Sequence, residues 1–169
     1  ALTWMLIEWI KHGKPSGLGA ITGMVAGLAT ITPASGSVGP GGALLVGLSG
    51  GVICYFATNY LKQVIKIDDA LDVFPVHGIG GMVGTFLAGI LVSDQLGILS
   101  GNGYAEGMTM ASQSMVQVTG IAAVAIYTAI VTFVLLKLVG VVTSGIRVTA
   151  EQEQVGLDIT DHDETGYNM

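Results

Sequence analysis

Long stretches without a charged residue dominate this sequence and limit what it can fold into. No Lys, Arg, Asp or Glu occurs between Lys14 and Lys62, between Asp72 and Asp94, or between Glu106 and Lys137. The last two intervals contain 21 and 30 residues, and a helix needs about 20 mostly apolar residues to cross a bilayer. The sequence therefore predicts an all-α fold, a polytopic bundle of membrane-spanning helices.

The charge-free intervals predict four complete spans, at about residues 18–34, 41–60, 73–93 and 115–139. The first interval holds two of them, because residues 32–42 are rich in Pro, Gly and Ser and indicate a loop. Residues 1–10 are also apolar, but as a helix they would extend only about 15 Å. We expect them to be the end of a further span, and the chain to be a fragment.

The distribution of basic residues predicts how the spans are oriented. If every segment crosses the membrane, all six Lys and Arg residues fall on one side, and cations accumulate on the cytoplasmic side of membrane proteins. They are Lys11, Lys14, Lys62, Lys66, Lys137 and Arg147. We therefore expect a multi-pass protein of the inner or plasma membrane with a cytoplasmic C-terminus. Trp4, Trp9 and Tyr60 lie near span ends and are interpreted as interface anchors.

Composition excludes several classes of function. Charged residues make up 11% of the chain, against about 25% in a soluble domain, and these few cations argue against nucleic-acid binding. No nucleophile–base combination that would indicate an enzyme is found. No second His, Cys or carboxylate stands at ligand spacing near the intramembrane histidine, so we expect no metal and no cofactor.

Small residues recur every four positions in three of the predicted spans. This spacing lets helix backbones approach closely in lipid, and it has two interpretations: a tight bundle around a narrow path, or helix packing with no path. The residues are Gly19, Gly23 and Gly27; Gly47 and Gly51; and Gly80, Gly84 and Ala88.

His77 is the most informative single residue, because it lies inside an apolar span, five residues after Asp72. An ionisable group inside a membrane is costly and indicates a functional site by default. A neutral imidazole accepts a proton on one nitrogen and donates from the other, which suits a proton relay; the alternative is a histidine that hydrogen-bonds a neighbouring helix. Asp68 and Asp69 are interpreted as loop acids that can also cap the N-terminus of this helix. Asp72 either caps the helix or shapes an inner vestibule, with the structural role favoured.

Three stretches of the sequence resemble the ammonium transporter, methylammonium permease and Rhesus family. The most specific is the motif Asp-Val-Phe-x-Val-His-Gly at residues 72–78, preceded by Asp68-Asp69. The others run from Glu8-Trp9 to Gly13-Lys14-Pro15 and on through residues 22–28 and 31–34, and from Arg147-Val148 with Glu151 into the tail.

This resemblance implies an eleven-helix fold with an inverted repeat, assembled as a homotrimer with one pore per subunit. The chain would supply the end of the seventh helix through the eleventh, as a bundle at residues 1–143 with a tail at 144–169, and the N-terminal half would complete the transporter. His77 would be the second member of a twin-histidine pair in mid-pore. Thr22, Val25 and Val73 match positions that line the pore.

The acidic last segment resembles the cytoplasmic regulatory tail of the same family. In the family this tail packs on the neighbouring subunit and, in prokaryotic members, helps receive a PII-type signal protein. The matching residues are Gly156, Asp158, Thr160, His162 and Tyr167. Asp163 departs from the pattern, because the family usually has Gly after the histidine. The alternative is a disordered, solubilising tail, and Thr160 is either a phosphorylation position or an ordinary polar residue.

The resemblance implies transport of ammonium or ammonia through a hydrophobic pore with a histidine proton relay. The cation is recruited outside and deprotonated, ammonia crosses, and the proton follows along the histidines. Two alternatives remain at this point: an ammonium sensor with the same fold that binds the cation and signals without transport, and a membrane subunit that only packs.

A lone His77 cannot form a two-histidine relay, so residues 1–169 by themselves are expected not to conduct. Reconstituted into liposomes without an N-terminal half, the chain should give no ammonium-driven current. A current equal to that of a full-length protein would contradict this expectation.

Overall fold

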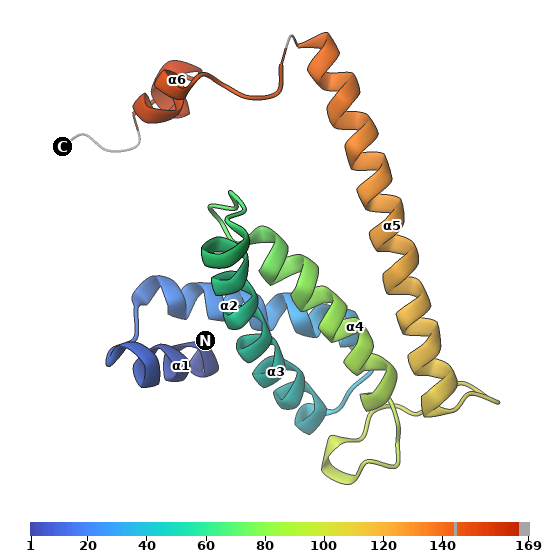
Figure 1. The fold of residues 1–169 in the computed structure, drawn as a ribbon. Helices are drawn as coiled ribbons and strands as arrows, with labels where there is room; N and C mark the ends of the chain where they lie inside the picture. The colour runs from blue at the N-terminus through green and yellow to red at the C-terminus, as the bar shows by residue number, and fades with distance from the viewer. Residues whose placement is uncertain (144, 166–169) are drawn as a thin grey trace. The chain divides into compact units, whose positions relative to one another are not determined.

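The computed structural model describes residues 1–143 and 145–165, and that part of the chain is helical (Figure 1). The α-helices are α1 (Leu2–His12), α2 (Gly17–Ile31), α3 (Pro40–Asn59), α4 (Gly80–Leu91), α5 (Met110–Val142), α6 (Ala150–Val155) and α7 (Leu157–Thr160). Two π-helical segments, η2 (Tyr60–Ile65) and η3 (Phe74–Ile79), extend α3 and lead into α4. The 3₁₀ turns η1 (Thr32–Ala34) and η4 (Gly97–Leu99) lie in the connections. The expected all-α fold is confirmed.

Each of the four predicted spans has a counterpart among the described helices. The stretches long and apolar enough to cross a membrane are Gly17–Ala34, Pro40–Ile65, Phe74–Leu91 and Met110–Val142. The last begins earlier than predicted, because the Thr109 hydroxyl accepts a hydrogen bond from the backbone N–H of Ser112 at 3.2 Å and starts the helix among polar residues. The second continues past Lys62, whose long side chain can carry its charge to the membrane surface.

Helices α2, α3 and α4 pack together at Thr30, a residue with no exposed surface. An added Cβ at Gly50 of α3 would collide with the Thr30 side chain, and one at Gly84 of α4 would fall on the Thr30 carbonyl oxygen. The Thr30 hydroxyl donates to the carbonyl oxygen of Ala26 at 2.7 Å, so its polar atom is satisfied within its own helix. The periodic glycines of α3 and α4 therefore serve close helix packing.

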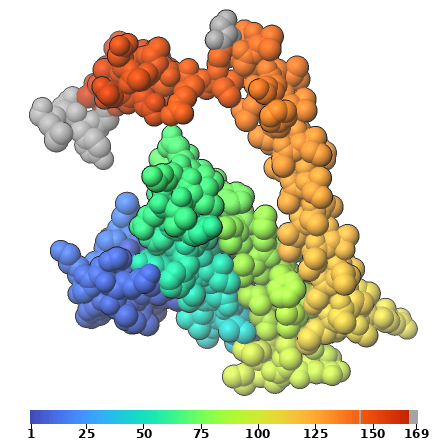
Figure 2. Space-filling model, in the orientation of Figure 1, coloured from blue at the N-terminus to red at the C-terminus, as the bar shows by residue number. Residues whose placement is uncertain are grey.

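Beside this crossing lies a core cluster that joins α1, α2, α3 and η3. Its buried members are Trp4, Ala26, Cys54, Tyr55 and Val76. The rings of Trp4 and Tyr55 meet edge to face with centroids 5.2 Å apart. Residues of α1 to α4 accordingly form one packed body in the space-filling view (Figure 2).

The interface-anchor prediction is wrong for Trp4 and consistent with the exposure of the other two aromatics. Trp4 is only 4% exposed, whereas Trp9 and Tyr60 are 62% and 56% exposed. Trp4 lies inside because α1 packs against α2 and α3, and position along the chain does not reveal which side of a short helix faces that contact.

The two connections that lack Lys and Arg lie together at one end of the bundle. Val38 and Gly101 form an isolated antiparallel bridge, and the Asn102 side-chain amide donates to the carbonyl oxygen of Gly36 at 2.6 Å. The loops after α2 and after α4 are thus on the same side, as the alternating crossing of the predicted spans requires.

Contacts divide the chain into two units, residues 1–122 and 123–169. The first holds α1 to α4 and the beginning of α5, and the second holds the rest of α5 with α6 and α7. None of the 33 residues of α5 is buried. The division into a bundle at 1–143 and a tail at 144–169 stays a prediction.

Gly84→Ala is expected to destabilise the bundle by about 1–3 kcal/mol, because the new methyl group meets backbone that cannot move aside. The control is Gly81→Ala on the same helix, where an added Cβ has no atom within 4 Å. That change should be neutral or stabilise by up to about 1 kcal/mol. Thermal unfolding of the full-length protein in detergent measures both, and equal midpoints would contradict the packing role of Gly84.

Candidate functional site

His77 lies in the π-helical segment η3, between a buried valine and the start of α4. Val76 packs in the core cluster and is 2% exposed, whereas the next residue, His77, is exposed. Within the described residues no side chain hydrogen-bonds to this imidazole. π-Helical turns inside longer helices are frequent at functional sites. The imidazole is therefore carried on a helical segment of a type common at functional sites, and neither nitrogen has a partner among the described residues.

The other predicted pore residues lie directly before η3 and on α2. Val73 precedes η3 and is 51% exposed, and His77, four residues later, is also exposed. Val25 is half-buried and packs against the core cluster that contains Val76. Thr22, also half-buried, stands three residues before Val25 on α2. Because α2 contacts η3, the structure brings Val25 close to the segment that carries His77.

The carboxylate of Asp69 caps the helix that carries His77. Its Oδ1 accepts the backbone N–H of Val73 at 2.9 Å, and its Oδ2 accepts that of Phe74 at 2.8 Å. The first N–H groups of a helix lack partners within it, and a carboxylate there is also favoured by the helix dipole. The sequence allowed capping by Asp68, Asp69 or Asp72; Asp69 makes these bonds.

Asp72 forms an ion pair with a lysine from the end of the preceding helix. Lys62 Nζ, on η2, lies 2.7 Å from Asp72 Oδ1, and the two side chains are 39% and 14% exposed. No donor in the described residues is aligned for a hydrogen bond to that oxygen, which is buried, so the contact is an ion pair. Asp72 has φ 56°, in the left-handed region. A role for Asp72 in an inner vestibule stays a prediction.

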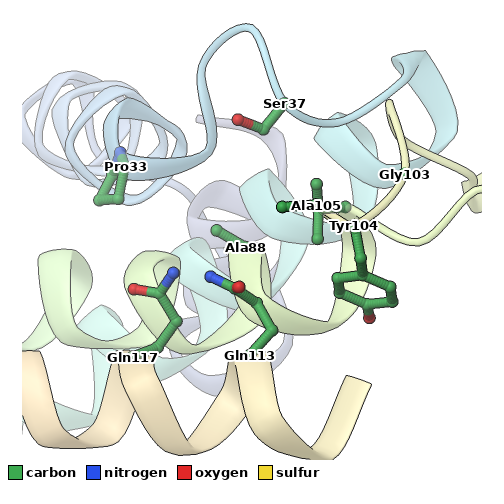
Figure 3. A pocket seen from close by; sticks show the side chains of 9 residues that line it. Pro33, Ser37, Ala88, Gly103, Tyr104, Ala105, Gln113 and Gln117 are labelled. Carbon is green, nitrogen blue, oxygen red and sulfur yellow. The ribbon is translucent and has the colours of Figure 1, made fainter. Parts of the chain in front are cut away.

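A small cavity lies at the opposite end of α4 from His77. It has a volume of about 140 Å³ and is lined by Pro33, Ser37, Ala88, Val92, Gly103, Tyr104, Ala105, Gln113 and Gln117. In Figure 3 the amide side chains of Gln113 and Gln117 extend from α5 toward α4. None of the lining residues is charged, so the cavity offers hydrogen bonds but no group for proton transfer near neutral pH.

The tail contains two short helices, of which α6 begins with a side-chain cap and α7 has none. Thr149 and Gln152 form a reciprocal capping box at the start of α6, and Gly156, at φ 103°, separates α6 from α7. The Thr160 hydroxyl donates to the carbonyl oxygen of Gly156 at 3.2 Å.

The remaining tail predictions fall around the end of α7. The carbonyl oxygen of Asp158 accepts the N–H of Glu164 at 2.8 Å, and His162 is exposed. Asp163 has φ 51°, the conformation that favours glycine, which is the residue the resembling family usually has there. Tyr167 lies outside the described residues.

Sequence reasoning missed Lys62 as a site residue and did not single out the Asp69 cap. A signal for each was present: three acidic residues precede an apolar span, and charges of opposite sign flank one connecting loop. The loop conformation that brings Lys62 to Asp72 depends on left-handed backbone at Lys66 and Asp72, which neither residue type requires.

A family model described as "Ammonium Transporter Family" matches residues 1–167. Similar curated proteins include the ammonium transporter Amt1 of Archaeoglobus fulgidus, 42% identical over 166 residues, and the ammonium transporter of Bacillus subtilis, 40% identical over 166 residues. Each alignment covers 97% of this chain and 40% of the relative. The chain therefore spans about 40% of the length of these curated relatives.

Solved structures of fungal Mep2 proteins resemble the described fold. The crystal structure of Candida albicans Mep2 matches with a TM-score of 0.74 at 33% identity, covering 89% of this chain and 34% of that chain. Saccharomyces cerevisiae Mep2 matches with a TM-score of 0.75 at 33% identity over the same shares of the two chains.

Asp69→Ala is expected to cost about 1–2 kcal/mol of stability, because the N–H groups of Val73 and Phe74 lose their acceptors. Asp69→Asn keeps one acceptor oxygen and should lose less. Thermal unfolding of the full-length protein gives the cost, and hydrogen exchange at residues 73–77 localises it. Unchanged exchange there in the alanine variant would contradict the capping role.

Proposed function

Because this chain belongs to the ammonium transporter family, we propose that it forms part of a transporter that moves ammonium or ammonia across a membrane, with His77 in its proton relay. The observation that carries the proposal is the position of His77: it is the fourth residue of the apolar span Phe74–Leu91, and its exposed imidazole has no hydrogen-bond partner among the described residues. The relatives named above are transporters, which also argues against an enzyme.

The proposed pathway follows from the cost of burying charge. Ammonium is a cation, and an unpaired charge in an apolar environment is costly, whereas neutral ammonia crosses far more cheaply. Val73 and Val25 would give the pathway an apolar wall, and the Thr22 hydroxyl would add a hydrogen-bonding group. His77 would accept and pass the proton that ammonium leaves behind, since a neutral imidazole has both an acceptor and a donor nitrogen.

We propose that the rest of the transporter covers the open side of His77 and supplies the second histidine of the pair. Both Val73 and His77 are exposed, and an isolated histidine facing lipid would be costly. The N-terminal half of the same transporter, assembled as a homotrimer, is the proposed partner. Membrane lipid would cover apolar surface that remains.

The tail is proposed to be cytoplasmic and regulatory. All six Lys and Arg residues lie in segments on one side of the predicted spans, which supports a cytoplasmic C-terminus. The helices α6 and α7, the first with a capping box, support an ordered tail over a disordered one. Gly156, Asp158, Thr160, His162 and Tyr167 are the residues proposed to contact a neighbouring subunit or a PII-type signal protein.

His77→Ala in the full-length protein is expected to abolish the proton-coupled component of transport, because no other group on η3 can carry a proton. Uptake of labelled methylammonium into proteoliposomes measures substrate transport, and the transient current recorded with it measures the proton-coupled component. His12→Ala is the control, since His12 lies on α1, outside η3, and the one hydrogen-bond contact of its exposed imidazole among the described residues is to the Tyr55 hydroxyl at 3.2 Å.

Three outcomes separate the hypotheses. Loss of current or uptake in His77→Ala, with no loss in His12→Ala, supports the relay. Unchanged uptake and current in that variant would contradict it and favour a packing role for His77. Ammonium binding by the unaltered protein without any uptake would instead identify a sensor.

A further inference from the structure

We propose that Lys62 is a positioning residue for the pore: its ion pair with Asp72 holds the first turn of η3, and with it His77, in the transport-competent arrangement. The inference rests on the proposed function and adds to it a residue outside the pore wall. It starts from the 2.7 Å contact between Lys62 Nζ and Asp72 Oδ1.

The ion pair is more than a surface contact, because its acidic partner, Asp72, is largely buried. Exposed ion pairs contribute little to stability, and Lys62 is partly exposed, but the Asp72 side chain is only 14% exposed. Its Oδ1 is buried and has no aligned donor among the described residues. Removing the lysine would leave that carboxylate oxygen buried without compensation, which costs far more than the pair itself contributes. Asp72 would therefore have to move.

A change at Asp72 would be passed directly to the helix that follows. Asp72 adopts φ 56°, a conformation that non-glycine residues hold only when surrounding contacts impose it. In that conformation its carbonyl oxygen accepts the N–H of Val76 at 3.0 Å. Val76 is the buried residue directly before His77. The path from Lys62 to His77 thus runs through one ion pair and one backbone hydrogen bond.

The loop between Lys62 and Asp72 is short and is held by a backbone hydrogen bond back to η2. This bond fixes the position of Lys62 relative to η3. Lys66 ends η2 with φ 60°, and the N–H of Ile67 bonds back to the Leu61 carbonyl at 3.0 Å. Leu61 is 7% exposed and anchors the end of α3 beside Lys62. Lysine and aspartate therefore face each other from two elements that are each anchored in the packed bundle.

The test measures methylammonium uptake by the full-length protein in proteoliposomes, at matched amounts of folded protein. Lys62→Met keeps the length of the side chain and removes its charge. It should lower the maximal rate by about three- to tenfold with the half-saturation concentration unchanged, because the substrate-binding groups are intact and the relay is displaced. Lys62→Arg should restore most of the rate, since it can still pair with Asp72.

A double-variant cycle separates positioning from a general effect of charge. If Lys62 acts through Asp72, Lys62→Met combined with Asp72→Asn should be no slower than Asp72→Asn alone. Lys14→Met is the control: Lys14 lies in the loop between α1 and α2, is exposed, and has no acidic partner within ion-pair distance among the described residues. Its rate should equal that of the unaltered protein.

The outcomes distinguish this inference from the proposed function. Wild-type rates in Lys62→Met, additive losses in the double variant, or an equal loss in Lys14→Met would each overturn the positioning role while transport itself stands. Absence of uptake by the unaltered protein would instead overturn the proposed function.

Discussion

The close approach of three helices at Thr30 is the constraint on which the rest of the bundle depends. Gly50 and Gly84 bring α3 and α4 against α2 at a distance that no side chain would allow, and an added Cβ at Gly80 would lie 3.0 Å from the Thr30 hydroxyl oxygen. The core cluster around Cys54 and the tied loops at the cation-free end follow from that crossing. Because α4 continues η3 without a break, the same contact also fixes the position of the helix that carries His77.

A second requirement of the membrane environment governs the N-terminal end of the span that carries His77. Helix N–H groups without partners are costly where water is scarce, and Asp69 provides acceptors for two of them. Asp72 would add a second charge beside them, and Lys62 compensates it. Of the acidic residues before His77, one therefore caps the helix and another forms an ion pair, and His77 itself has no hydrogen-bond partner among the described residues.

Family membership and local chemistry support one account of function from different directions. The chain matches 40% of the length of transporters such as that of Bacillus subtilis, and the described part exposes Val73 and His77 instead of enclosing them. A proton relay needs a second group and a closed, water-poor path. In the proposal these residues would supply one wall of such a path, which is why the remainder of the transporter belongs to it.

The sequence by itself determined the all-α membrane fold and its four spans, because charge-free intervals of sufficient length have few alternatives. It also pointed to His77, since an ionisable residue stands out against apolar neighbours. Only the tertiary structure decided that Trp4 is buried, which of three aspartates caps the helix, and that Lys62 meets Asp72. Those outcomes depend on which face of a helix meets its neighbour and on left-handed backbone at single loop positions, and neither property is encoded by residue type alone.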